Sequence, residues 1–495
     1  YFYRLSENME TISKQIKGVP SLISSLIILL FMNACYYTES ADLLIHNAKI
    51  YTVDQKFSIA EALAVKGGKI IDVGANNELK NRYRASREID AMNRSIFPGF
   101  IDAHCHFFAY GNTHFQVNLV GTKSWNEVLD RCVEFSKGFE GDWIQGRGWD
   151  QNDWEIKEFP TKKELDSLFP ETAILIKRID GHAAMANQKA LSLAGVNESS
   201  TIEGGVIESK NGQVTGLLID NAVDLVSAAI PSPGFEEIQR ALLKAEQDCF
   251  AVGLTTLDDA MLEFDVAQVI DSLQKSQKLK MKVYGMLMPT EENKSHYLEK
   301  GPYKSDRLNI RAFKYFADGA LGSRGAKLLE PYSDDLHNTG LFLSDSSYFM
   351  EEAMRLNEQG FQMNTHCIGD AANQMILNIY AEVLGGTNDK RWRIEHAQVV
   401  SPEDMKKFQE NTIIPSVQPT HATSDMYWLE ERLGATRKKN AYANKQLLEQ
   451  NGIIALGTDF PIEGISPFST FYAAVARKDA KSYPEGGFQM ENALS

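Results

Sequence analysis

The chain has 495 residues, of which 43% are hydrophobic and 24% are charged, and these values are ordinary for a globular protein. It shows no low-complexity tract and no internal repeat, which argues against extended disorder and against a solenoid. The 66 acidic and 51 basic residues give a formal net charge of -15, which disfavours nonspecific binding to nucleic acids.

The N-terminal segment differs from the rest of the chain. Lys14 and Lys17 precede the apolar run SLISSLIILLFMNA, which ends just before Cys35. This run is too short for a membrane span of about 20 residues but suits a signal peptide. The motif FMNAC resembles a lipoprotein box and predicts a signal over residues 1–35 with lipidation of Cys35; an uncleaved anchor is the alternative. In either case we expect export to a bacterial cell envelope or periplasm.

Residues 36–95 predict a small β module. DLLIHNAKIYTVD and ALAVKGGKIIDVG each have the pattern of a short strand pair. The second pair folds around Gly67 and Gly68, which supply a tight turn.

From Ile96 onward, apolar runs alternate with helical stretches, which predicts a (β/α)8 barrel. The interval between the first two runs is too long for one connection between a strand and the next, so it must hold an inserted domain. We expect the first barrel strand and its loop over 96–114, an inserted substrate-side domain over 115–250 and the remaining barrel over 251–495. The eight predicted strands span 96–106, 254–258, 281–286, 310–316, 361–366, 392–396, 413–418 and 453–459.

The first barrel strand ends in two histidines one residue apart. Alternate side chains of a strand lie on the same face, so His104 and His106 would project together in a chelating arrangement. The carboxyl end of a strand is also where α/β folds place their chemistry. Two hydrogen-bonded histidines at a barrel rim are the alternative.

Three further residues occupy predicted strand ends. His366 lies in NTHCIGD, His396 in RIEHAQ and Asp459 in GTDFPI. Imidazole and carboxylate groups suit Zn²⁺ or a similar divalent ion, so the combined set predicts a metal cluster. Singly, each has another interpretation: a hydrogen-bonded core histidine, or a helix-capping aspartate before Pro461.

Lys314 is the unusual member of this set. It shares a strand face with Asp318, and an ammonium pointing toward metal ions is unfavourable unless its charge is changed or neutralised. An ion pair with Asp318 is one solution, and a carbamate formed with CO₂ is the other.

With these residues in hand, the chain resembles the amidohydrolase superfamily, in the amidohydrolase-3 branch of metal-dependent hydrolases. The motifs PGFIDAHCH, WDQNDW, RIDGHAAMANQKAL, FKYFADGALGSR, NTHCIGD, RIEHAQ, QPTH and GTDFPI occur in the family's order. The resemblance implies a distorted barrel beside a small β-sandwich. Relatives continue beyond a segment like GGFQMENALS, so we expect this sandwich to be incomplete at the C-terminus.

The resemblance also implies a ligand set for a binuclear metal site. It implies His104 and His106 as ligands of the first strand and a bridging, carbamylated Lys314. His366, His396 and Asp459 complete the set. Zinc is the default among divalent metals, with one or two ions.

The reaction that the resemblance implies is hydrolysis of a carbon–nitrogen bond other than a peptide bond, in an amide or cyclic amide, by a metal-activated hydroxide. Asp459 would carry the proton to the departing nitrogen. His182 and His421 match positions that face the pocket in the family, with His421 the stronger catalytic candidate. Arg324 could clamp a substrate carboxylate, and Trp149 could form an aromatic lid, although a salt bridge and core packing are the commoner roles.

Two alternative functions remain open at this stage. The same metal site can hydrolyse lactones or other esters, and an envelope lipoprotein with this fold could bind a ligand without turnover. In each case the expected partner is a small molecule, and the membrane is contacted only through the N-terminal signal or lipid anchor. A homodimer is an open option.

Overall fold

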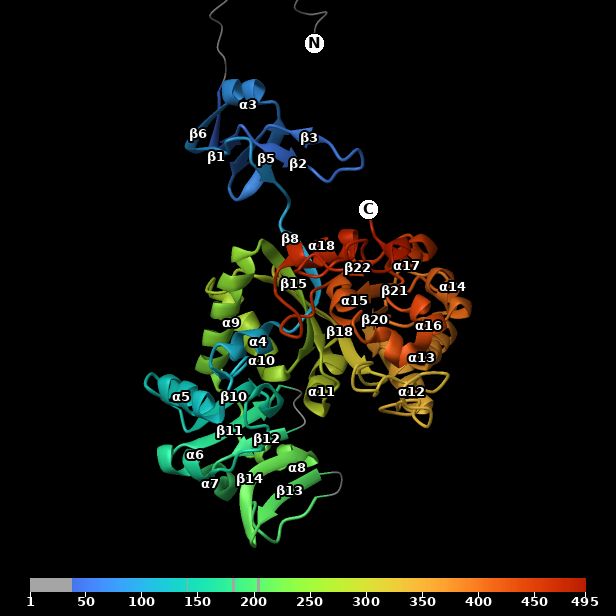
Figure 1. The fold of residues 1–495 in the computed structure, drawn as a ribbon. Coiled ribbons are helices and arrows are strands. Elements are labelled where there is room, and N and C mark those ends of the chain that lie inside the picture. Colours follow the sequence, from blue (N-terminus) through green and yellow to red (C-terminus); the bar gives the residue numbers. More distant parts are fainter. Residues whose placement is uncertain (1–37, 140, 180–182, 203–204) are drawn as a thin grey trace, which may run out of the picture. The chain divides into compact units, whose positions relative to one another are not determined.

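The computed structural model describes residues 38–139, 141–179, 183–202 and 205–495 (Figure 1). The chain divides into two compact units between Gly99 and Phe100. Within the described ranges, no helix has the length and apolar character needed to cross a membrane. The expected signal segment and Cys35 lie outside the described residues, so export and lipid anchoring stay predictions.

The first unit contains two small sheets. The hairpin around Gly67 and Gly68 is confirmed, because Lys66 pairs with Lys69 across it. The expected first strand pair is wrong: Asn47 adopts a φ of 51°, a left-handed conformation that asparagine tolerates, and the strands on either side of it enter different sheets. One sheet has the order β5-β4-β1-β6, and the other has the order β3-β2-β7. Their elements are β1 (Glu39–His46), β2 (Lys49–Tyr51), β3 (Ile59–Ala60), β4 (Ala62–Lys66), β5 (Lys69–Gly74), α3 (Asn76–Arg82), β6 (Tyr83–Asp90) and β7 (Ser95–Ile96).

The second unit contains the predicted barrel. Eight strands in the order β22-β21-β20-β19-β18-β16-β15-β8 form a parallel, nearly closed sheet, so the predicted fold class is confirmed. Each of the eight predicted segments overlaps one of these strands, and four of the strands extend beyond the predicted bounds. They are β8 (Phe100–Cys105), β15 (Leu254–Leu262), β16 (Lys282–Leu287), β18 (Leu308–Phe316), β19 (Gln362–Cys367), β20 (Arg393–His396), β21 (Ile414–Val417) and β22 (Ala455–Leu456).

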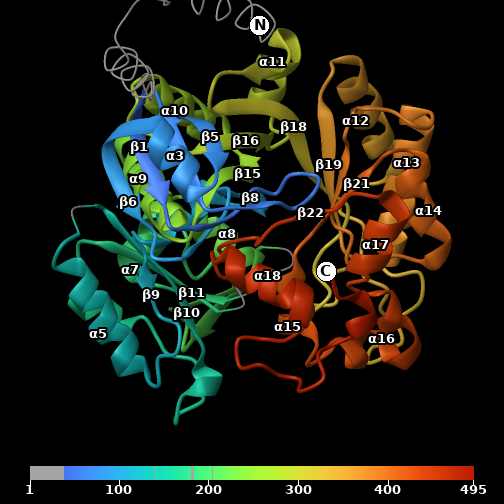
Figure 2. The ribbon, with the colours of Figure 1, turned by 90° about the horizontal axis from the view of Figure 1, so that it is seen from above.

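Helices surround these strands, as seen from above in Figure 2. The longer helices bury an apolar stripe; the helix before β15, for example, buries Ile238, Leu242 and Ala245 at helical spacing. Most of their buried side chains form one large core with the outer faces of the strands, and those of α15 and α16 belong to a second, smaller cluster. The helices of this unit outside the insertion are α4 (Phe107–Thr113), α9 (Phe235–Ala251), α10 (Phe264–Lys275), α11 (Glu291–Lys300), α12 (Ser346–Glu358), α13 (Asp370–Leu384), α14 (Pro402–Glu410), α15 (Pro419–Asp425), α16 (Leu429–Arg437), α17 (Asn444–Asn451) and α18 (Pro467–Ala476).

The long interval between β8 and β15 contains its own six-stranded sheet, in the order β13-β14-β12-β11-β10-β9. Separate clusters of apolar side chains pack on this sheet, which gives the insertion a core of its own. Its elements are β9 (Val117–Asn118), α5 (Trp125–Ser136), β10 (Trp143–Trp149), α6 (Lys163–Leu168), β11 (Ala173–Arg178), β12 (Ala183–Ala186), α7 (Gln188–Leu193), β13 (Gly205–Lys210), β14 (Gln213–Asp220) and α8 (Asn221–Ser227).

The barrel closes where the last strand reaches the first. The backbone amide of Asp459 donates to the carbonyl of His104 over 2.7 Å, and that of His106 donates to the carbonyl of Phe460 over 2.8 Å. Gly457 makes this close approach feasible, because a Cβ atom added to it would lie 2.5 Å from the backbone nitrogen of His104.

Replacing Gly457 with alanine is therefore expected to destabilise the barrel by about 2 kcal/mol or more, since the added methyl group must push two strands apart. Denaturant unfolding followed by circular dichroism measures this loss. Gly464→Ala is the matched control, because a Cβ there meets no atom within 4 Å. Equal stability of the two variants would contradict the proposed role of Gly457.

Candidate metal centre

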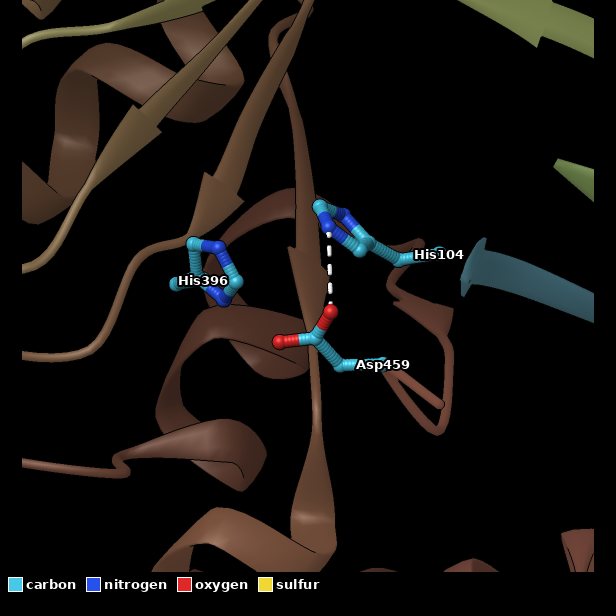
Figure 3. Close-up of side chains that lie close together, drawn as sticks. All are labelled: His104, His396 and Asp459. Atoms are coloured by element: carbon cyan, nitrogen blue, oxygen red, sulfur yellow. Dashed lines mark ion pairs between the residues drawn. The ribbon is translucent and has the colours of Figure 1, made fainter. Parts of the chain in front are cut away.

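The predicted ligands come from separate barrel strands and meet at the ends of those strands. His104 is the last but one residue of β8, His396 is the last residue of β20, and Asp459 follows β22. Figure 3 shows the three side chains pointing toward one another. His104 has no exposed surface, and His396 and Asp459 are 7% and 4% exposed.

The distances within this group are those of side chains that could share an ion. One nitrogen or oxygen from each of His104, His396 and Asp459 lies within 4.8 Å of the other two. Asp459 Oδ1 is 3.6 Å from His104 Nε2 and 3.1 Å from His106 Nε2. The ring of His366 joins the group, with its centroid 4.6 Å from that of His396. The structure therefore brings together the four histidines and the aspartate singled out in the sequence.

Each of three imidazoles is held through its Nδ1 atom. His104 Nδ1 is 2.5 Å from Glu395 Oε2, His106 Nδ1 is 2.6 Å from the carbonyl of Ala260, and His396 Nδ1 is 2.7 Å from Gln418 Oε1. An acceptor at Nδ1 keeps the proton there and leaves the lone pair on Nε2 for a metal. This arrangement is typical of metal-binding histidines.

Two of the predicted ligands have unusual backbone conformations. His396 has a φ of 73° and Asp459 a φ of 62°. Both values lie in the left-handed region that residues other than glycine rarely adopt. Such strain persists only where the surrounding structure fixes it, and it is concentrated at functional sites. At His396 the backbone rotation also explains how this residue joins the site although it directly follows the inward-pointing Glu395 in the strand.

The protonation states of the group suit metal binding. Burial lowers the pKa of His104 to about 4 and that of His366 to about 3. Burial alone would raise the pKa of Asp459, but the surrounding imidazoles, led by His104, hold it well below its ordinary value. At neutral pH the site thus offers neutral imidazoles and an ionised carboxylate, which are the forms that bind divalent ions.

Lys314 lies beside this group on β18. Its side chain is 1% exposed, and its Nζ atom is 3.5 Å from His104 Nε2 and 4.6 Å from the centre of the Phe316 ring. Burial lowers the pKa of Lys314 to about 8. No carboxylate among the residues described in the structure lies within 4.0 Å of this amine.

The alternative ion pair between Lys314 and Asp318 is absent among these described residues. Asp318 instead accepts hydrogen bonds from the backbone amides of Lys327, Ile368 and Gly369, at 2.8, 3.0 and 2.8 Å. Its carboxylate therefore fixes the loop after β18 rather than neutralising Lys314.

His421 approaches the same centre from α15. Its Nε2 atom is 3.5 Å from Asp459 Oδ2, on the opposite carboxylate oxygen from the one that faces His104 and His106. Its ring is nearly parallel to that of His396, at a centroid distance of 5.9 Å. In the described structure, His421 Nε2 is buried without a hydrogen-bond partner, as expected for an atom that faces a bound ion or substrate.

The three residues expected to contact a substrate have different surroundings or lie outside the described residues. Trp149 is completely buried and donates its Nε1–H to the carbonyl of Ile176, so the expected aromatic lid is wrong and this side chain fills the core of the insertion. The Arg324 guanidinium already makes a two-pronged contact with Asp334, at 3.1 and 2.9 Å, instead of the expected clamp on a substrate. His182 lies outside the described residues.

The sequence interpretation missed two charged residues next to the predicted ligands, Arg393 and Glu395. A signal was present in RIEH, because arginine and glutamate two positions apart in a buried strand must point into the barrel together. Charged groups there need partners, and a neighbouring histidine ligand is one of them.

A model of the amidohydrolase family, Amidohydro_3, matches residues 87–495. The Bacillus subtilis protein YtcJ, whose name assigns it to the amidohydrolases, is 34% identical over 447 residues, covering 88% of this chain and 84% of YtcJ. The N-substituted formamide deformylase of Arthrobacter pascens is 25% identical over 478 residues, covering 90% of this chain and 86% of the relative.

Among solved structures, an uncharacterised metal-dependent hydrolase from Pyrococcus horikoshii superimposes with a TM-score of 0.77 at 27% identity. The match covers 91% of this chain and 89% of the archaeal one. A second such hydrolase, from Pyrococcus furiosus, gives a TM-score of 0.76 at 26% identity, with 91% of each chain covered.

Proposed function

Because the chain belongs to the amidohydrolase family, we propose that it hydrolyses a carbon–nitrogen bond other than a peptide bond, in an amide or cyclic amide. The observation that carries this proposal is the buried cluster of His104, His396 and Asp459, whose imidazoles are oriented by acceptors at Nδ1. A protein that only binds a small molecule, without turnover, would need no ionised carboxylate beside these histidines.

The residues of the cluster fit a divalent metal. Neutral imidazole nitrogens and a carboxylate oxygen suit zinc, and Oδ1 of the buried Asp459 faces the Nε2 atoms of both His104 and His106. The residues that would hold one or two ions are His104, His106, Lys314, His366, His396 and Asp459. Bound there, a divalent ion lowers the pKa of water toward neutrality and polarises a carbonyl group.

Asp459 is placed to move the proton. Its low pKa keeps the carboxylate ionised at neutral pH, so it can accept the proton of the attacking water. The same carboxyl group can then deliver that proton to the departing nitrogen. A carboxylate with two differently placed oxygens suits this transfer, because Oδ1 faces His106 while Oδ2 faces His421.

His421 is proposed to stabilise the negative charge that develops on the carbonyl oxygen. Its imidazole lies 3.5 Å from Asp459 and is 14% exposed, so it can reach a substrate held beside the carboxylate. A hydrogen bond that a ring N–H donates to the developing oxyanion is stronger in the transition state than in the ground state, and this difference accelerates the reaction.

The deformylase relative supports a carbon–nitrogen bond as the target, since its name describes cleavage of N-substituted formamides. The test is a panel of N-formyl and N-acyl amines, cyclic amides, lactones and simple esters, offered to protein loaded with zinc. We expect turnover of at least one amide class and its loss after metal removal. Turnover of lactones or esters alone would replace this proposal by the ester hydrolase, and no turnover with metal bound would favour the binding protein.

We also propose that Lys314 becomes a carbamate. Only a neutral amine reacts with CO₂, and the pKa of Lys314, lowered to about 8 by burial, leaves more neutral amine as the pH rises. Carbamate formation should therefore increase between about pH 6 and about pH 9, followed by the ¹³C resonance of protein kept in labelled bicarbonate.

Lys294 provides the matched control for this measurement. It is also buried, but its Nζ atom is 2.9 Å from Glu352 Oε2, so its amine is already engaged in an ion pair. We expect Lys314→Met to remove the carbamate resonance and Lys294→Met to retain it. A resonance that survives in Lys314→Met would assign the carbamate to another amine.

A further inference from the structure

The barrel interior next to the candidate metal centre carries charges where aliphatic side chains are usual. Arg393 and Glu395, both on β20, are 6% and 0% exposed. Asp258 on β15 is their third charged partner, with its side chain 15% exposed. Buried charges are costly unless each is paired and hydrogen-bonded, so their contacts show what they serve.

The Arg393 guanidinium joins four strands. Its Nε atom is 2.6 Å from Glu395 Oε1, and its Nη1 atom is 2.7 Å from Asp258 Oδ2. Its Nη2 atom donates to Ser416 Oγ on β21, at 3.1 Å, and to the carbonyl of Ala103 on β8. A planar guanidinium with donors in fixed directions holds its partners in one geometry.

The two carboxylate oxygens of Glu395 contact different residues, Arg393 and the predicted metal ligand His104. Oε1 accepts from Arg393, while Oε2 lies 2.5 Å from His104 Nδ1. The carboxylate cannot rotate to leave His104 without also breaking its contact with Arg393. The position of the His104 ring is therefore set by the guanidinium, through Glu395.

His104 differs in this respect from the two other ligands held at Nδ1. The partner of His106 is the backbone carbonyl of Ala260, and the partner of His396 is the neutral amide oxygen of Gln418. Only the partner of His104, among these three, is a buried carboxylate whose own geometry depends on a second side chain.

We propose that Arg393 and Glu395 are positioning residues for the metal centre, which fix His104 with its Nε2 lone pair toward the ion. This inference rests on the proposed metal-dependent function. It assigns to the pair a role in retaining metal, because a ligand that is oriented before binding loses less freedom when the ion arrives. Removing the carboxylate charge should weaken metal binding while the other ligands remain in place.

The test compares Glu395→Gln with Glu352→Gln. Glu352 is an equally suitable buried carboxylate, 8% exposed and paired with Lys294 and Tyr315, but none of its recorded contacts is a ligand of the metal centre. Zinc affinity is measured by competition with a chromogenic chelator, and the visible spectrum of the cobalt-loaded protein reports the ligand geometry. We expect Glu395→Gln to bind zinc about 10- to 100-fold more weakly with an altered cobalt spectrum. Glu352→Gln should match the wild type in both.

Arg393→Lys keeps the proposal testable if Glu395→Gln fails to fold. Lysine retains the positive charge but lacks the planar set of N–H donors of the guanidinium, so Glu395 becomes free to move. Zinc affinity should therefore fall, as in Glu395→Gln. Wild-type affinity and an unchanged cobalt spectrum in a folded variant of either residue would overturn the positioning role. Failure of the wild-type protein to bind zinc or cobalt would instead contradict the metal-dependent function itself.

Discussion

Replacing Asp459 with asparagine is expected to lower kcat by about 10²- to 10⁴-fold, the usual contribution of a positioned proton carrier. Asparagine keeps an oxygen in the same place and is nearly the same size, so metal should stay bound. It cannot accept a proton from water or deliver one to nitrogen. KM should change much less than kcat, because the loss falls on the chemical step.

Steady-state kinetics on the best amide of the substrate panel, with metal content determined on the same sample, measures this effect. Asp271→Asn is the control, since Asp271 pairs with Lys275 and Tyr303 on the outside of the barrel. Asp459→Asn protein that keeps both its metal and its kcat would remove Asp459 from the proton transfer.

Removing the metal is expected to lower the free energy of unfolding by about 4 kcal/mol, if the protein had been held at free metal near 1,000 times its dissociation constant. The physical reason is that the folded barrel binds the ion far better than the unfolded chain. The ligands lie far apart in the sequence and meet only in the folded structure. The apo protein must also keep these polar groups buried without the ion.

Calorimetric unfolding with and without a strong chelator measures this difference. His396→Ala serves as the control, because it removes one member of the cluster and its unfolding should hardly respond to the chelator. An unfolding temperature of the wild type that is indifferent to metal would contradict a metal centre built from these residues.

The barrel could be predicted from the sequence because its strands are buried on both faces and appear as continuous apolar runs between turn signals. The pairing of the first two strands could not be predicted. At Asn47 one left-handed residue directs the chain into a second sheet, and a sequence pattern does not reveal which asparagines adopt that conformation.

The gathering of the candidate ligands could be predicted for a similar reason, since histidines and an aspartate at strand ends must meet at one rim of a barrel. Their partners were harder to identify. Glu395 stands next to His396 in sequence but binds His104, and nothing in the local pattern indicates that exchange across the barrel. Trp149 was misjudged because an aromatic residue near functional motifs looks the same in sequence whether it lines a pocket or fills a core.

The hydrogen bonds that close the barrel join the end of its first strand to the residues that follow its last strand. The amide of Thr458 donates to Asp102, which lies 356 positions away, and the next residue, Asp459, is itself a predicted ligand. During synthesis on the ribosome, His104 emerges long before Asp459, so the full ligand set is absent until nearly the whole barrel has been translated. Metal binding by the full set would then require that the last barrel strand is already in place. A chain that ends before Asp459 would lack one of the predicted ligands.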